Sequence, residues 1–181
     1  MLRCNIRAQG LLVSVLERAQ RAGRISCKTA LQRCMASENS TMECTINWMP
    51  ANGMAFSAQT GSGHLLTMDG APDGGGHNLA PRPMETVLAG TGGCTAYDVV
   101  LILQRGRHDV RGCRVVVTSE RAPTDPKVFT KIHMHFVVNG PGLTDAAVER
   151  AIRLSHEKYC SATIMLGKTA EITTSFVIEN E

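Results

Sequence analysis

The sequence predicts an α+β domain, in which strands and helices are grouped along the chain rather than alternated one by one. Short alternating segments separated by turn residues come first, and a long apolar helical segment follows at 84–107. A second group of strands and amphipathic helices closes the chain. The length of 181 residues suits one domain with an added segment.

Three short strands are expected at the start of the domain. Segments 44–49, 54–60 and 64–68 alternate apolar and polar residues, and the turn sequences PANG, GSG and DG follow them in that order. This pattern is typical of an antiparallel meander. Residues 70–82 are rich in glycine and proline, so we expect a loop without regular structure there.

One long helix is expected over residues 84–107. Pro83 suits its first position, where a missing N–H has no helical partner to lose. The segment is apolar on nearly every side, which predicts burial through the middle of an assembly. Gly90, Gly92 and Gly93 each cost the helix about 1 kcal/mol relative to Ala. Close approach of another backbone would offset that cost.

The last part of the chain predicts a hairpin, helices and a final strand. Segments 111–121 and 127–140 alternate as two paired strands, and in the second Lys131, His133 and His135 share one face, which we expect to be solvated. An amphipathic helix is expected over 143–160. A second helical piece at 161–168 and a strand at 170–179 complete the domain.

Residues 1–41 differ in composition from the rest. They carry seven basic and two acidic residues, a net charge of +5, whereas residues 42–181 carry twelve basic and fourteen acidic residues, a net charge of −2. The segment could be an Arg-rich targeting peptide, a disordered arm, or sequence upstream of a natural start at Met42. We favour the last two and place the folded domain at 42–181.

Charge and cysteine usage limit the function classes. The body of the chain is not basic and carries no recognisable nucleic-acid motif, so nucleic-acid binding is not expected. The sequence contains no run of 18 or more apolar residues, so no membrane span is expected. The seven cysteines are an odd number scattered through periodic segments, which favours free or catalytic thiols in a reducing compartment, hence the cytoplasm.

Two cysteines stand out from the others. Cys94 follows Gly92 and Gly93, which remove bulk beside its sulfur, and Cys160 follows His156 by one helical turn. Each could instead be a small buried hydrophobic residue. His156 and Cys160 also have the spacing of helical metal ligands, but zinc needs three or four ligands and no second pair accompanies them. We therefore predict no metal. The remaining cysteines are read as incidental or packing residues: Cys4, Cys27, Cys34, Cys44 and Cys113.

Two motifs resemble the OsmC/Ohr family of thiol peroxidases, most of all its YhfA-like branch. They are PMETVLAGTGGCTAYDVV around Cys94 and HEKYCSATIML around Cys160, 66 residues apart. The stretch DVVLILQRGRHDVRGC and the TSER that follows it agree with that branch. The resemblance covers residues 42–181.

The resemblance implies a fold and a chemistry. It implies an intertwined homodimer, with antiparallel sheets wrapped around long central helices and the active sites at the subunit interface. Cys94 would attack an organic hydroperoxide, and Cys160 would resolve the sulfenic acid to a disulfide. A dithiol, lipoyl-linked in some members, would reduce the disulfide. No cofactor is implied.

The sequence departs from the family in what activates the thiol. A peroxidatic cysteine must become a thiolate, and family members use an Arg from the early strands held by a Glu at the start of the helix. Here PANGMAF has no Arg, Met84 stands at the Glu position, and Glu85 lies on the opposite side of the helix from Cys94. Arg82 is a candidate substitute, and the alternative is that it is a solvated loop residue.

Asp98, four residues after Cys94, would raise the thiol's pKa unless a cation or a backbone group pairs with it. It could also orient the missing cation. The leading hypothesis is thiol-dependent reduction of organic hydroperoxides. The main alternative is a ligand-binding or redox-sensing dimer of the same fold, and a weaker one is a metal-binding protein using Cys160, His156 and a group of a second subunit.

Overall fold

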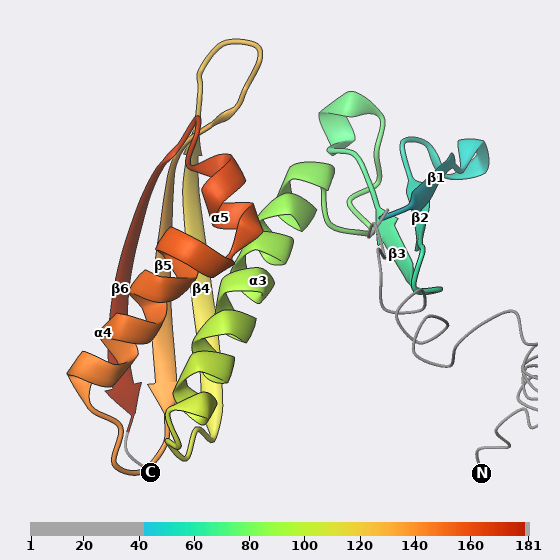
Figure 1. The fold of residues 1–181 in the computed structure, drawn as a ribbon. Coiled ribbons are helices and arrows are strands. Elements are labelled where there is room, and N and C mark those ends of the chain that lie inside the picture. The colour runs from blue at the N-terminus through green and yellow to red at the C-terminus, as the bar shows by residue number, and fades with distance from the viewer. Residues whose placement is uncertain (1–41, 180–181) are drawn as a thin grey trace, which may run out of the picture. The chain divides into compact units, whose positions relative to one another are not determined.

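The computed structural model describes residues 42–179, and the extension 1–41 lies outside the described residues. Figure 1 shows the element order. The described residues fall into two compact units, one holding 42–45 and Thr60–His64 and the other Ile46–Gln59 and 65–179. In the smaller unit, the Gly61 N–H donates to the carbonyl of Glu43 at 2.7 Å.

The first sheet contains the three predicted short strands. They are β1 (Cys44–Trp48), β2 (Phe56–Thr60) and β3 (Leu65–Met68), in that order in the sheet. Strands β2 and β3 pair antiparallel. The PANG turn forms the short 3-10 helix η1 (Pro50–Asn52). Gly53 follows with φ +64°, and its carbonyl accepts the indole N–H of Trp48 at 2.8 Å.

The loop after β3 is organised by one buried carboxylate. Asp69 is 1 % exposed and accepts backbone N–H bonds from Gly70, His77 and Leu79 at 2.7–3.0 Å. These hydrogen bonds lower the pKa of the carboxyl below its ordinary value. The N–H of Leu79 contributes most, and those of His77 and Gly70 contribute less. Although no regular structure was expected here, the loop holds one 3-10 turn, η2 (Pro72–Gly74).

Helix α3 (Pro83–Arg105) confirms the predicted long helix and its proline start. At its beginning, the Arg82 N–H donates to Glu85 Oε2 at 2.9 Å, which satisfies a donor at the helix end. The glycines behave differently from one another. A Cβ at Gly92 would lie 3.0 Å from Val117 Cγ2, whereas Gly90 and Gly93 have nothing within 4 Å. Within the described chain, the close approach of a neighbour therefore explains only Gly92. That neighbour is a side chain rather than a backbone.

By length and composition α3 could cross a membrane, but core helices of soluble proteins pass the same test.

The second sheet has the order β4 (Gly112–Arg121), β5 (Phe129–Asn139) and β6 (Glu171–Glu179). The predicted hairpin is confirmed, since β4 and β5 pair antiparallel. Strand β6, however, runs parallel to β5, so the expectation of wholly antiparallel sheets is wrong for this pair. The reason is the helical crossover between them, because such a connection returns the chain to the end of the sheet where β5 began.

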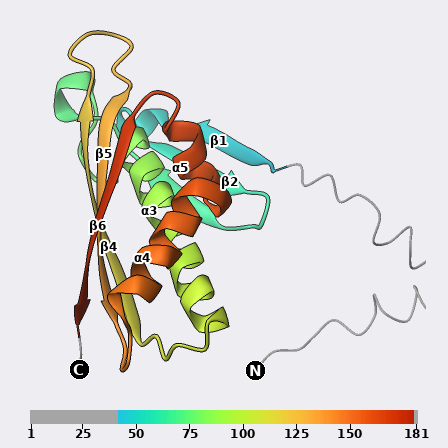
Figure 2. The ribbon, with the colours of Figure 1, turned by 60° about the vertical axis from the view of Figure 1, so that its left-hand side comes forward.

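That crossover consists of α4 (Asp145–Leu154), a π-helical turn η3 (Ser155–Tyr159) and α5 (Ser161–Leu166). Helices α3, α4 and α5 lie on one face of the β4–β5–β6 sheet (Figures 1 and 2). The core lies between sheet and helices. It includes Ile132, Met134 and Phe136 of β5, each at most 1 % exposed. The predicted α+β class is confirmed.

Candidate functional site

The two cysteines singled out by sequence meet where α3 passes the end of the crossover. Cys94 lies half-buried in the middle of α3, and Cys160 is fully buried between η3 and α5. Their sulfurs and a carboxylate oxygen of Asp98 all lie within 4.8 Å of one another. Both thiols are free. A disulfide would require the two sulfurs to approach to about 2.05 Å.

The π-helical turn sets the position of Cys160. The Cys160 N–H donates to the carbonyl of Ser155, five residues earlier, at 2.8 Å. Cys160 then takes an extended conformation as the N-cap of α5, and the Thr163 hydroxyl donates to its carbonyl at 3.0 Å. The extra residue in this turn places the thiol between two helices rather than on the apolar face of α4.

Asp98 is held by a hydroxyl rather than by a cation or a backbone group. The buried Ser155 hydroxyl donates to Asp98 Oδ2 at 3.0 Å, and Ser155 Oγ lies 2.9 Å from Thr95 Oγ1. Neither ion pair found within residues 42–179 involves Asp98. The structure thus brings Thr95 and Ser155, which the sequence did not single out, to the cysteine site.

The surroundings raise the pKa of Cys94 above its ordinary value of 9.0. Burial is the largest cause, and the neighbouring Cys160 thiol and the Asp98 carboxylate act in the same direction. The Ala162 N–H opposes them. Within the described chain, no cation acts on this thiol strongly enough to make it a thiolate at neutral pH.

Two further candidate site residues, Arg82 and Glu85, lie at the start of α3. Arg82 precedes Cys94 by twelve residues, which is roughly 18 Å along the helix at about 1.5 Å per residue. Glu85 is occupied with the backbone of Arg82. Both line a cavity of about 420 Å³ together with Met84, Arg121 and Phe129, among other residues. Arg82 therefore does not reach Cys94 of its own chain.

His156 lies in a different hollow. It lines a space of about 340 Å³ with Glu149, Arg153, Ser175 and Phe176, among others, and its buried Nδ1 has no hydrogen-bond partner among the described residues. The one-turn spacing to Cys160 predicted a shared face, but the wider π-helical turn changes the angular relation between the two residues.

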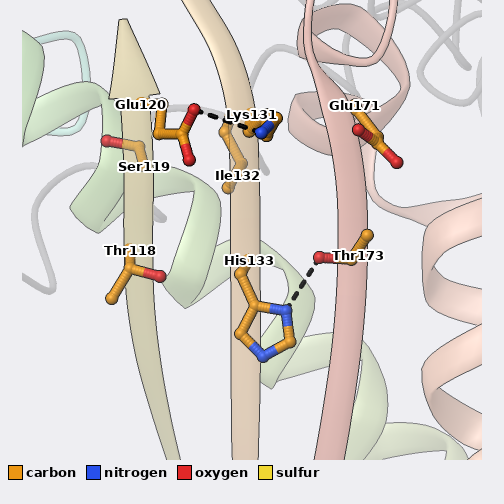
Figure 3. Close-up of a pocket in the computed structure, with 8 residues that line it drawn as sticks. All are labelled: Thr118, Ser119, Glu120, Lys131, Ile132, His133, Glu171 and Thr173. Atoms are coloured by element: carbon orange, nitrogen blue, oxygen red, sulfur yellow. Dashed lines mark hydrogen bonds and ion pairs between the residues drawn. The ribbon is translucent and has the colours of Figure 1, made fainter.

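His133 points to the sheet face opposite the core, as predicted with Lys131 (Figure 3). His135 shares that face, because side chains two residues apart on β5 lie on the same side of the sheet. Both histidines are half-buried rather than fully solvated because β6 hydroxyls hold them. His133 bonds Thr173 and Ser175 at 2.8 and 2.9 Å, and Ser175 also bonds His135 Nδ1 at 2.8 Å. Thr173 and Ser175 account for these contacts without any ligand.

A smaller hollow of about 220 Å³ opens beside the cysteine site. Asp98 lines it together with apolar and aromatic side chains and one arginine. The other lining residues are Leu101, Ile102, Arg105, Leu154 and Tyr159. The site as a whole combines two close thiols, one carboxylate and an adjacent largely apolar space.

Comparisons with known proteins agree with these features. The family model described as OsmC-like protein matches residues 75–175, and the chain is 47% identical to Protein YhfA of Escherichia coli (strain K12) over 137 residues. That alignment covers 76% of this chain and 98% of YhfA. The chain belongs to the OsmC-like family. The matched region contains both Cys94 and Cys160.

Solved structures extend the OsmC-like assignment to the fold. One, described only as structural genomics, is 45% identical, with a TM-score of 0.69 over 77% of this chain and 99% of its own. A second is described as an organic hydroperoxide resistance protein OsmC from Legionella pneumophila. It has a TM-score of 0.58 and 16% identity, covering 77% of this chain and 98% of its own, and shows the fold alone.

Proposed function

We propose that this protein reduces organic hydroperoxides through a cycle of Cys94 and Cys160. The observation that carries the proposal is the approach of the two sulfurs to within 4.8 Å, with one thiol half-buried and reachable and the other fully buried. Membership of the OsmC-like family and a fold shared with hydroperoxide resistance proteins support it.

In the first step, the Cys94 thiolate attacks the terminal oxygen of the hydroperoxide. The O–O bond breaks, the sulfur becomes a sulfenic acid, and the leaving alkoxide takes a proton to become the alcohol. The Cys160 thiolate then attacks the sulfenic sulfur, which forms the disulfide and releases hydroxide, which a proton converts to water. A dithiol, lipoyl-linked or free, reduces the disulfide by exchange and is itself oxidised.

The substrate's organic part would occupy the hollow beside Asp98. Leu101, Ile102 and Leu154 offer an apolar wall, and Tyr159 offers an aromatic one. A space of about 220 Å³ suits a short alkyl or aryl group or one segment of a longer chain. This wall favours organic hydroperoxides over hydrogen peroxide, which has no apolar part to bury.

A homodimer in the cytoplasm completes the proposal. Helix α3 leaves Gly90, Gly93 and Tyr97 exposed, Tyr97 at 69 %, and the glycines leave room for a second helix. Apolar residues are exposed elsewhere in the described chain as well, which favours burial against a second copy. They include Ile46, Trp48, Leu65 and Met165, each at least 55 % exposed.

The partner subunit would also supply the missing cation. Because Arg82 is roughly 18 Å along α3 from Cys94 of its own chain, it can activate a thiol only across an interface. Arg105 of the same chain lines the hollow beside Asp98 and can offset the charge of that carboxylate. It follows Cys94 by eleven residues, roughly 16 Å along the helix, so it does not reach the thiol. The partner's Arg82 would favour the Cys94 thiolate and offset the charge of Asp98.

The proposal is tested by hydroperoxide consumption with and without a lipoyl dithiol. The parent protein should turn over many equivalents only when the dithiol is present. Cys94→Ser should be inactive, while Cys160→Ser should consume about one equivalent and hold a Cys94 sulfenic acid that a dimedone probe labels. Cys113→Ser, which alters a half-buried thiol outside the cluster, is the matched control. Full turnover by Cys94→Ser would refute the cycle.

A second candidate, a ligand-binding or redox-sensing dimer, is favoured by one observation. The chain alone raises the pKa of Cys94, with burial as the main cause, which opposes fast peroxide chemistry. Rates of Cys94 alkylation against pH separate the candidates. A peroxidase requires a midpoint below the ordinary 9.0, because only then is the thiolate abundant at neutral pH. A midpoint above that value, with no dithiol-dependent turnover, selects the sensor.

A further inference from the structure

We propose that the reduced protein binds one divalent zinc-like cation through Cys94, Cys160 and Asp98. Two thiol sulfurs and a carboxylate oxygen within 4.8 Å of one another form a three-ligand set of the kind that zinc uses. The proposal goes beyond the hydroperoxide cycle and does not depend on it, because it requires only that both cysteines are reduced.

The spacing fits a tetrahedral ion after a small closing movement. Zinc–sulfur bonds of about 2.3 Å and zinc–oxygen bonds of about 2.1 Å place tetrahedral ligands roughly 3.6–3.8 Å apart. The observed limit of 4.8 Å is about an ångström wider. Cys160 lies at the junction of the π-helical turn and α5, outside both helices, where a movement of this size requires no helix to break.

The carboxylate is already oriented as a metal ligand would need. Ser155 donates to Asp98 Oδ2 at 3.0 Å and is itself held by Thr95 at 2.9 Å, and no other side chain among residues 42–179 bonds this carboxylate. Outer hydrogen bonds of this kind fix the orientation of metal ligands. Because no ion pair within residues 42–179 engages Asp98, a cation would also relieve the crowding of three acidic groups.

Cation binding and the disulfide exclude each other, since the cation needs both sulfurs as thiolates. In oxidation, two bound thiolates, one hydroperoxide and two protons give the disulfide, one alcohol, one water and the free cation. Three protein ligands leave the fourth position open to water from the half-buried Cys94 side. The cation would therefore protect the thiols and be released when they are oxidised.

The test is anaerobic titration of the reduced full-length protein with Co²⁺, followed by displacement with Zn²⁺. We expect one equivalent that depends on this cluster, with a thiolate-to-cobalt charge-transfer band and tetrahedral visible bands. Cys94→Ser and Cys160→Ser should abolish that equivalent, Asp98→Asn should weaken it at least tenfold, and Cys113→Ser should retain it. Circular dichroism checks the folding of each variant.

A measurement without substitution guards against misfolded variants. Protein carrying a preformed Cys94–Cys160 disulfide should lack this equivalent and regain it after reduction. Binding that is unchanged by Cys94→Ser, or a spectrum without the charge-transfer band, overturns the proposal. Hydroperoxide turnover is measured separately in the presence of a chelator, so loss of the metal site and loss of the peroxidase cycle are distinguishable.

Discussion

Ser155 connects the two halves of the cysteine site, and its removal should be measurable in both stability and reactivity. Its hydroxyl donates to Asp98 and contacts Thr95, and the residue is fully buried. A hydrogen bond to a charged group contributes about 1.5–3 kcal/mol, and leaving a buried hydroxyl unpaired costs about 1–3 kcal/mol. Since part of Asp98 can be rehydrated, we expect Ser155→Ala to lower the free energy of unfolding by about 2 kcal/mol.

Urea denaturation of the reduced protein measures this change. Ser161→Ala, at an exposed position one residue after Cys160, is the matched control and should stay within about 0.5 kcal/mol of the parent. Asp98→Ala and the double variant complete a cycle, and a coupling energy above about 0.5 kcal/mol is expected for groups in contact. If Ser155→Ala matches Ser161→Ala and the coupling is near zero, the network does not hold Asp98.

Three further changes test other parts of the account. Asp69→Asn should weaken the fold more at pH 7 than at low pH. Backbone donors hold the pKa of Asp69 below its ordinary 3.8, so its stabilisation is fully present above that pH and is lost as pH falls through the lowered pKa. Urea midpoints at pH 7 and at a series of pH values below 3.8 check this, and an equal loss throughout would contradict it. A chain starting at Met42 should fold and sediment like the full chain, and an insoluble or monomeric product would contradict the proposed domain boundary. Arg82→Ala should slow oxidation of Cys94 by hydroperoxide at least tenfold, about 1.4 kcal/mol in the barrier, and an unchanged rate would contradict activation by Arg82 across the interface.

Local sequence features were enough to predict most elements of the fold. Pro83 marked the start of α3 correctly, and alternation of apolar and polar residues located β4 and β5 to within a few residues. The orientation of β6 was not predictable in this way. Alternation reports which residues share a face, whereas strand direction depends on how the helical crossover returns to the sheet.

The candidate site was predicted only in part. The motifs identified Cys94 and Cys160, and helical spacing placed Asp98 on the face of Cys94. Ser155 did not stand out in the helix expected over 143–160, since a buried serine has the same periodicity as a buried apolar residue. A buried hydroxyl needs a partner, and that requirement was the signal that could have connected it to Thr95 or Asp98.

The most direct test of the central claim is peptide mapping after reaction with one equivalent of an organic hydroperoxide. The reduced protein should yield a Cys94–Cys160 disulfide as the main cross-linked peptide, with Cys44 and Cys113 still free. Dithiol treatment should return both thiols. Recovery of Cys160 as a free thiol beside unmodified or overoxidised Cys94, or a link from Cys94 to any other cysteine, would contradict the two-cysteine cycle.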